Sequence, residues 1–272
     1  MPGELLVRER HGAVLELRLN NPPYNGLTGP LLATYVAALA EAAVDDEVRA
    51  IVTTSGTPTW CAGGELGDLA EGATSHTLSE LLHASTGETD SLTLAERRAD
   101  RLGVGRYVLA IDAFDKPMVA AIGGAAAGGG VALALLHDVC FASPEAVFTV
   151  AFTRIGLTLE MGLSYLLPRA VGPQAAFDLA ATSRRVGAEE ALALGLVFRL
   201  VDQADLVPAA LEYAQRLAAQ APLGVQLAKR LLRRTWDHRF ADQLEAEWPW
   251  QVAAFASPES QAAIEALAKR AR

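Results

Sequence analysis

Two glycine-rich segments of the sequence have the residue types needed to hold a negatively charged oxygen. They are residues 60–66 (WCAGGEL) and 125–131 (AAAGGGV), and each lies between a predicted strand and a predicted helix. Glycine lets a backbone approach a ligand closely, and the first N–H groups of a helix have no partner inside it. Such turns can present free N–H donors to an anion, although tight packing alone would also explain them.

Other catalytic motifs are incomplete in this chain. Gly123 and Gly128 have the spacing of a nucleotide phosphate loop, but Gly129 stands where that loop needs a lysine. No G-x-G-x-x-G sequence follows the first predicted strand, so the dinucleotide fingerprint is missing. Residues 162–166 (GLSYL) lack the closing glycine of a nucleophile elbow, which makes a serine hydrolase the weaker hypothesis.

The composition narrows the expected partners. The 272 residues include 32 Asp and Glu against 23 Lys and Arg, and the resulting net charge of −9 disfavours a nucleic acid partner. Cys61 and Cys140 cannot form a disulfide framework, and the five histidines show no metal-ligand spacing. The first ten residues lack the apolar core of a secretory signal. We therefore expect no metal, a cytoplasmic location and a small-molecule substrate.

Alternating strands and helices are predicted to position the glycine-rich turns. A hairpin is expected at residues 5–19, followed by a helix capped by Thr28 and a strand at 48–54. The alternation repeats between residues 118 and 142, which is typical of a layered α/β core.

One uncharged run, residues 117–136, is long enough on paper to span a bilayer. Five glycines lie in its middle, with Val and Ile before them and Ala and Leu after them. Glycines weaken a continuous helix, so we predict a buried strand, turn and helix and no membrane segment.

Two further regions differ from this core in composition. Residues 67–115 are polar and regain helical spacing only from Leu92, which predicts a mobile wall beside the core. Residues 205–272 have an almost purely helical pattern, with tryptophans at 236, 248 and 250. We therefore predict a core over residues 1–204 and a helical C-terminal region over 205–272 that packs on a sister subunit.

The glycine-rich turns occur together with residues 152–169 (FTRIGLTLEMGLSYLLPR), and with these motifs the chain resembles the crotonase family of enoyl-CoA hydratases and isomerases. Residues 25–27 (NGL) are similar to the family's Asn-Ala-Leu. Residues 187–197 (GAEEALALGLV) are similar to its Ala-x-x-Ala-x-x-x-Gly-Leu-Val stretch. The resemblance covers nearly the whole chain.

This resemblance implies a fold, a substrate and an assembly. The fold would be α/β, a crotonase-like spiral of ββα units with a helical C-terminal trimerisation region. The substrate would be an acyl-CoA thioester, with no cofactor beyond the CoA that the substrate carries. The assembly would be a homotrimer or a dimer of trimers.

Matching the motifs residue by residue places the two oxyanion-hole N–H groups at Gly64 and Gly129 and the CoA-binding backbone at Cys61, Ala62 and Gly63. Proton removal beside a thioester carbonyl puts negative charge on its oxygen, and each preorganised donor stabilises that charge by about 3 kcal/mol. Candidates for the CoA phosphates, or for an ordinary solvated helix face, are Lys229, Arg230, Arg233 and Arg234.

The sequence departs from the hydratases of this family at two positions. Their two water-holding glutamates correspond to Ala132 and Phe152, so ordinary hydration lacks both of its catalysts. The carboxylate that remains is Glu160, placed where a double-bond-shifting branch of the family carries its base. One such group suffices for a 1,3-proton shift, so an enoyl-CoA isomerase is the expected activity. The alternative role for Glu160 is that of a helix N-terminal acid.

Three other functions stay open at this stage. One is an enolate rearrangement of an acyl-CoA that carries an aromatic ring. Another is a hydratase with relocated acids, for which Glu65 and Asp68 are available, although acids after such a turn are more often caps. The third is an acyl-CoA-binding protein without catalysis. For Asp138 we expect a structural hydrogen bond.

Overall fold

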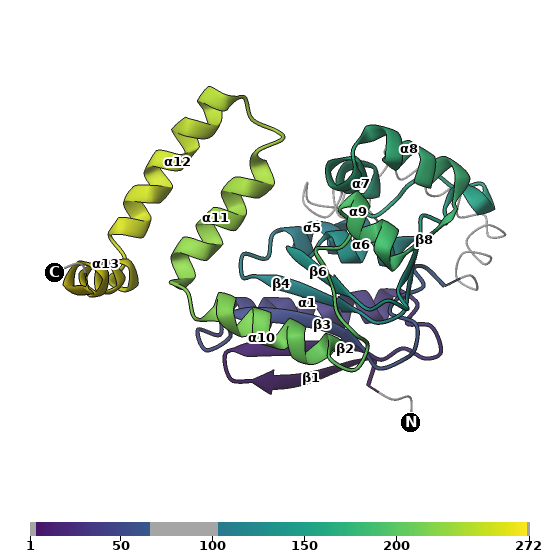
Figure 1. The fold of residues 1–272 in the computed structure, drawn as a ribbon, viewed down its shortest axis with the longest axis horizontal. Coiled ribbons are helices and arrows are strands. Elements are labelled where there is room, and N and C mark those ends of the chain that lie inside the picture. The colour runs from purple at the N-terminus through teal and green to yellow at the C-terminus, as the bar shows by residue number, and fades with distance from the viewer. Residues whose placement is uncertain (1–3, 66–102, 271–272) are drawn as a thin grey trace, which may run out of the picture.

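The computed structural model describes residues 4–65 and 103–270. Its main sheet has six strands in the order β1-β2-β3-β4-β6-β9 (Figure 1). Only β1 and β2 pair in antiparallel fashion, and the other neighbours are parallel. The strands are β1 (Leu6–His11), β2 (Val14–Leu19), β3 (Ala50–Ser55), β4 (Met118–Ile122), β6 (Val139–Ala142) and β9 (Arg199–Leu200).

A second, three-stranded sheet receives the chain from the first. It contains β5 (Ala125–Ala127), β7 (Val147–Thr149) and β8 (Arg185–Gly187), with β5 parallel and β8 antiparallel to β7. The chain thus passes from β4 into β5 and then into helix α6 (Gly129–Leu135), and β6 leads into β7 in the same way. The strand, turn and helix predicted for residues 117–136 are confirmed. None of the helices in the described ranges is both long and apolar enough to cross a membrane.

Helix α1 (Gly29–Val44) follows the hairpin as its sequence predicts. The side chain of Thr28 accepts a hydrogen bond from the N–H of Leu31 at 3.3 Å, which satisfies one free donor of the first turn. One face of the helix is buried against the main sheet, through Leu31, Leu32, Tyr35, Ala38, Leu39 and Ala42. Their helical spacing explains why the sequence pattern was sufficient here.

The opposite face of the main sheet is covered by α10 (Leu206–Ala218). Its buried residues recur every four positions, as Leu206, Ala210, Ala214 and Ala218. Alanine lets the helix lie close to the small and branched side chains of β2, β3 and β4. The predicted helical region 205–272 therefore begins with a helix that is packed on the sheet.

The remaining helices fall into two groups (Figure 1). Helices α5 (Gly105–Asp112), α7 (Leu163–Val171), α8 (Pro173–Thr182) and α9 (Ala188–Leu194), with the 3-10 turn Thr153–Ile155, belong to the compact part of the molecule. Helices α11 (Pro222–Arg234), α12 (Phe240–Phe255) and α13 (Pro258–Arg270) form an arm that stands away from it. Most of the wall predicted at 67–115 lies outside the described residues, and α5 is the part that can be seen.

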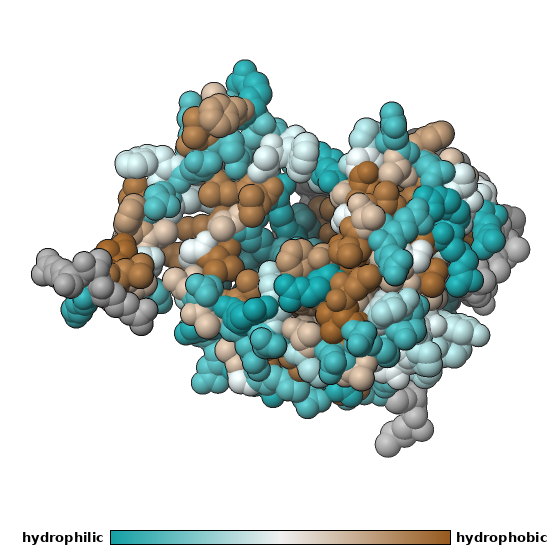
Figure 2. Space-filling model, in the orientation of Figure 1, coloured by the Kyte–Doolittle hydropathy of each residue, from teal (hydrophilic) through white to brown (hydrophobic). Residues whose placement is uncertain are grey.

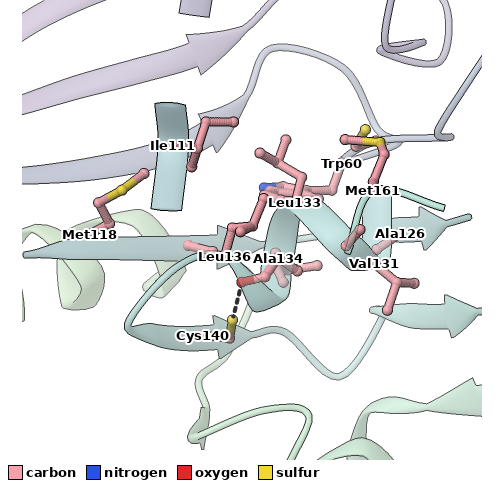
Figure 3. Packing of buried hydrophobic residues seen from close by; sticks show 14 of the residues in the cluster. Trp60, Ile111, Met118, Ala126, Val131, Leu133, Ala134, Leu136, Cys140 and Met161 are labelled. Atoms are coloured by element: carbon pink, nitrogen blue, oxygen red, sulfur yellow. Dashed lines mark hydrogen bonds between the residues drawn. The ribbon is translucent and has the colours of Figure 1, made fainter. Parts of the chain in front are cut away.

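The main core lies between the sheets, α1 and α6 (Figure 3). It encloses a small polar cluster in which Thr53 and Tyr35 bond the Nε2 atom of His137, at 2.7 and 3.3 Å. Nδ1 of His137 bonds the carbonyl oxygen of Leu133 at 2.8 Å. Burial lowers the pKa of His137 to about 4, so its ring is neutral at pH 7 and accepts through Nε2.

Candidate active site

The first glycine-rich turn is held in place by the side chain of Asn25. This residue is fully buried, with a left-handed backbone at φ 50°. Its side-chain nitrogen donates to the carbonyl oxygens of Thr59 and Trp60, both at 3.1 Å. The N–H of Leu27 donates to the carbonyl oxygen of Gly63 at 2.7 Å. The loop before α1 therefore fixes the position of the first turn.

The second glycine-rich turn is joined to the first by a parallel bridge between Cys61 and Ala126. The N–H of Cys61 donates to the carbonyl of Ala125 at 3.0 Å, and its carbonyl accepts from the N–H of Ala127 at 2.9 Å. A Cβ atom on Gly130 would lie only 2.2 Å from the carbonyl oxygen of Cys61, so this approach requires glycine. Two turns that are distant in the sequence thus lie side by side.

Gly63, Gly64 and Gly129 form what we call the glycine junction. Gly63 has a φ of 80°, and a Cβ atom built on it would lie 2.8 Å from the amide nitrogen of Gly129. Within the described part of the chain, neither Gly64 nor Gly129 donates a hydrogen bond through its N–H group. Gly64 is exposed, and Gly129 is the buried first residue of α6. The junction therefore holds two N–H donors, on adjoining turns, that bond no described residue.

Met161, the residue after Glu160, packs against this junction. A Cβ atom on Gly129 would lie 2.7 Å from the sulfur of Met161, which is buried and left-handed at φ 56°. The carbonyl oxygen of Glu160 accepts from the N–H of Leu163, at the start of α7, at 3.1 Å. The Glu160 side chain is exposed, and its carboxylate bonds no described residue. It does not cap α7, and no described residue occupies its oxygens.

The positions at which the resemblance places the hydratase glutamates are apolar in the structure. Ala132 lies on α6 and is completely buried. Phe152 is partly buried, and its ring is 3.9 Å from the place that a Cβ atom on Gly128 would occupy. Neither side chain can accept or donate a proton, so neither can activate water.

The other acidic candidates are engaged elsewhere or lie outside the described residues. Glu65 accepts a hydrogen bond from the side chain of Asn21 at 3.2 Å, which ties it to the loop before α1. Asp138 accepts from the N–H of Met118 at 2.8 Å, which confirms its expected structural role. Asp68 belongs to the part of the chain that the structure does not describe.

The predicted CoA-binding segment uses most of its backbone groups internally. Cys61 bonds the second turn through both its N–H and its carbonyl, and the N–H of Ala62 donates to Tyr24 at 3.0 Å. The carbonyl oxygen of Ala62 accepts no hydrogen bond from the described residues. Burial raises the pKa of the Cys61 thiol to about 12, which excludes a nucleophilic thiolate at neutral pH.

The basic residues considered for the CoA phosphates connect α11 to the rest of the chain. Nζ of Lys229 lies 2.8 Å from the carboxylate of Asp138 and 2.8 Å from the carbonyl oxygen of Lys116. The other three contacts are Arg230 with Asp115, Arg233 with Asp112 and Asp138, and Arg234 over the ring of Trp250. Lys229, Arg230 and Arg233 thus attach the arm to the core, which is a structural role.

One group of side chains on the β1–β2 hairpin has the composition of a metal site. Ligand atoms of Glu9, His11 and Glu16 lie within 4.8 Å of one another. The guanidinium of Arg18 bonds both glutamates, at 2.9 and 3.1 Å, and supplies positive charge there. Burial favours a raised pKa for Glu16, but hydrogen bonds from Thr54, Arg18 and His11 lower it below its usual value.

Two residues that shape the site were given no role from the sequence. Asn25 belongs to a motif that was used only for the resemblance. Its position shortly after two prolines is the sequence signal for a structural anchor, because asparagine tolerates the left-handed conformation that it adopts here. Met161 is signalled only by the glycine that follows it. Chemically, the junction donors can hold an oxyanion while the adjacent carboxylate moves a proton.

Comparisons with known proteins agree with the fold. The family model described as enoyl-CoA hydratase/isomerase matches residues 9–271. The probable enoyl-CoA hydratase EchA12 of Mycobacterium tuberculosis is 34% identical over 244 residues, which cover 89% of this chain and 80% of that protein. The 1,2-epoxyphenylacetyl-CoA isomerase of Escherichia coli is 29% identical and covers 98% of this chain and 97% of its own.

The solved structures extend this agreement to three dimensions. An enoyl-CoA hydratase from a Polaromonas species matches with a TM-score of 0.85 and 27% identity, over 97% of each chain. Such neighbours have the crotonase fold, so the predicted spiral of ββα units is confirmed.

Proposed function

Because the chain belongs to the enoyl-CoA hydratase/isomerase family, whose substrates are acyl-CoA thioesters, we propose that it moves a double bond of an enoyl-CoA. In this reaction Glu160 takes a proton from C2 of a 3-enoyl thioester. The electron pair of the broken C–H bond delocalises onto the thioester oxygen, which the N–H groups of Gly64 and Gly129 stabilise. The same carboxyl group returns the proton at C4, which gives the 2-enoyl product without any net gain or loss of atoms.

One observation carries this proposal: Glu160 precedes Met161, which packs against the glycine junction, and its carboxylate bonds no described residue, whereas Ala132 and Phe152 are apolar. Hydration needs a group that activates water, and a 1,3-proton shift needs only one acid–base residue. The packing of the Met161 sulfur against Gly129 supports the proposal, because it links the turn that contains Glu160 to the junction.

A second candidate function is favoured by a relative. The Escherichia coli protein that covers 98% of this chain is named for the isomerisation of 1,2-epoxyphenylacetyl-CoA. That name supports the enolate rearrangement of a ring-bearing acyl-CoA as the alternative substrate class. The same junction and the same carboxylate would serve both reactions.

The CoA part of the substrate is proposed to bind at the first turn, with Cys61, Ala62 and Gly63 forming its backbone wall. Within that segment, the carbonyl oxygen of Ala62, which accepts no hydrogen bond from the described residues, is the group proposed to bond the ligand.

The arm is proposed to form a homotrimer or a dimer of trimers. Its helices expose large apolar side chains, among them Trp236, Phe240 and Trp248, which are 68%, 79% and 71% exposed. Figure 2 shows hydrophobic patches along the arm and a recess between the arm and the core. Exposed apolar surface of this kind is typical of a subunit interface.

The proposed reaction is tested by incubating the protein with 3-enoyl-CoA in deuterated water. The double bond should move to C2, with deuterium appearing at C2 and C4. Glu160→Gln should slow this reaction about 10²–10⁴-fold, the usual contribution of a general base. Glu189→Gln, an exposed glutamate in the first turn of α9, is the matched control and should retain the wild-type rate.

Three outcomes would reject the proposal. If Glu160→Gln turns over like the control, Glu160 is not the base. If the wild-type protein incorporates oxygen-18 from water into an acyl product, hydration is the reaction. If the wild-type protein neither moves the double bond nor exchanges the C2 proton, the remaining function is acyl-CoA binding without catalysis.

A further inference from the structure

We propose that Asp237 and Tyr165 form a positioning pair that holds the Glu160 turn from the arm. Asp237 lies in the connection between α11 and α12, and Tyr165 lies in the first turn of α7. This inference rests on the proposed function, because it concerns the placement of the proposed base.

The pair is defined by direct contacts. The hydroxyl group of Tyr165 donates to the carboxylate of Asp237, whose two oxygens both lie 2.8 Å away. Arg169 supports the pair from the next turn of α7. Its guanidinium carbon is 3.2 Å from the centre of the Tyr165 ring, and one of its nitrogens is 3.6 Å from Asp237. A residue of the arm is thus fixed to a helix of the core.

A short chain of hydrogen bonds leads from Tyr165 to Glu160. The N–H of Tyr165 donates to the carbonyl of Gly162 at 2.9 Å, and the N–H of Leu163 donates to the carbonyl of Glu160 at 3.1 Å. Met161 and Gly162 are both left-handed, at φ 56° and 76°. A non-glycine residue keeps such a conformation only when its surroundings hold it. The position of α7 therefore determines where the Glu160 turn lies.

The arm is able to act as a fixed support because α11 is anchored independently of Asp237. Lys229 is buried and bonds Asp138 at 2.8 Å. One turn later, a guanidinium nitrogen of Arg233 donates to the carbonyl oxygen of Leu136 at 2.7 Å. Asp237 follows this anchored stretch directly, so its carboxylate has a defined place relative to the core.

The pair is too exposed to be explained by global stability alone. Tyr165 is 39% exposed, and the side chain of Asp237 is 53% exposed. Interactions at such positions contribute little to the stability of the whole fold. Their loss should therefore be felt locally, in the turn that precedes α7.

The experiment compares Asp237→Ala, Tyr165→Phe and Asp237→Asn with wild type. Asp242→Asn is the matched control, because Asp242 is also on the arm and pairs only with Arg239, at 2.9 and 3.0 Å, among the described residues. Amide hydrogen exchange is measured by mass spectrometry on the peptide covering residues 157–166, and kcat and KM are measured with 3-enoyl-CoA.

Asp237→Ala and Tyr165→Phe should speed amide exchange in this peptide and lower kcat at least fivefold, with KM within twofold of wild type. Asp237→Asn keeps an acceptor oxygen and should recover most of both properties. Asp242→Asn should behave like wild type.

The inference is overturned if Asp237→Ala leaves amide exchange in the peptide unchanged, whatever happens to kcat. It is also overturned if exchange increases while kcat stays at the wild-type value. A wild-type protein without any enoyl-CoA turnover would instead refute the proposed function. The amide exchange of residues 157–166 would then still decide whether the pair holds the turn.

Discussion

Replacement of Gly63 by alanine should separate the two glycine-rich turns and remove the oxyanion site. The added Cβ atom would lie 2.6 Å from the carbonyl oxygen of Ala127 and 2.8 Å from the amide nitrogen of Gly129. To restore an ordinary contact of 3.4 Å, the turns must move apart by about 0.6–0.8 Å. A displacement approaching 1 Å at a reacting group costs about 10²-fold in rate.

The expected loss of stability has two parts. Alanine at φ 80° adopts a left-handed conformation that costs about 1–2 kcal/mol, and the backbone overlap adds about 1–3 kcal/mol. Gly12→Ala is the matched control, because Gly12 has a φ of 64° and a Cβ atom there would meet nothing within 4 Å. The control should therefore lose only the first part.

The assay combines urea unfolding with exchange of the C2 proton of an acyl-CoA in deuterated water. Gly63→Ala should unfold more easily than Gly12→Ala and should exchange C2 at least 10²-fold more slowly. The reasoning is refuted if Gly63→Ala exchanges C2 within threefold of wild type. Equal free energies of unfolding for the two variants would contradict the expected overlap between the added Cβ atom at residue 63 and the backbone of the second turn.

Two further predictions concern acid stability and assembly. The folded pKa of His137, about 4, lies below its unfolded value of 6.5, so the neutral ring stabilises the fold above pH 6.5 and this stability is lost as the pH falls toward 4. Urea unfolding should show a loss of about 2 kcal/mol between pH 7 and pH 5 in the wild type, and His137→Gln should lack this part of the pH dependence. For assembly, native mass spectrometry of the wild type should give a multiple of three times 28.7 kDa, and Trp248→Glu should shift it toward the single chain. Val44→Glu is the control, because Val44 is 84% exposed and lies at the end of α1, outside the arm. This variant should keep the mass of the wild-type assembly. A single-chain mass for the wild type would reject the trimer.

The local parts of the fold followed from the sequence because their signals are local. Thr28 caps α1 as predicted, since the cap and its partner Leu31 are three residues apart. The uncharged run at 117–136 was assigned correctly because its glycines interrupt a helix. The helical region 205–272 was predicted as a whole, and α12, which begins at Phe240, lies within it. Helix α13 also lies within the predicted helical region, but its exposed faces give little apolar periodicity from which its bounds could be predicted.

The residues of the candidate site could be predicted only where they belong to a recognisable sequence motif. Glycine-rich turns suggested free N–H groups, but nothing in the spacing indicates that Gly63 would touch Gly129 across a parallel bridge. The same holds for Met161, whose sulfur is placed by tertiary packing. The contact between Tyr165 and Asp237 depends on how α11 docks, which local patterns do not encode. From the sequence, the basic face of α11 was interpreted either as a site for the CoA phosphates or as a solvated helix face. Its buried and paired residues show that it contacts the core of this chain.

The central claim is that Glu160 moves a proton from C2 to C4 while the glycine junction holds the enolate. The most direct test is a single turnover of 3-enoyl-CoA carrying deuterium at C2, in ordinary water, with the product analysed by mass spectrometry. The expected result is a 2-enoyl product that retains a measurable fraction of the deuterium at C4, and loss of this transfer in Glu160→Gln. An unmoved double bond with all deuterium still at C2, across several acyl chains, would contradict it.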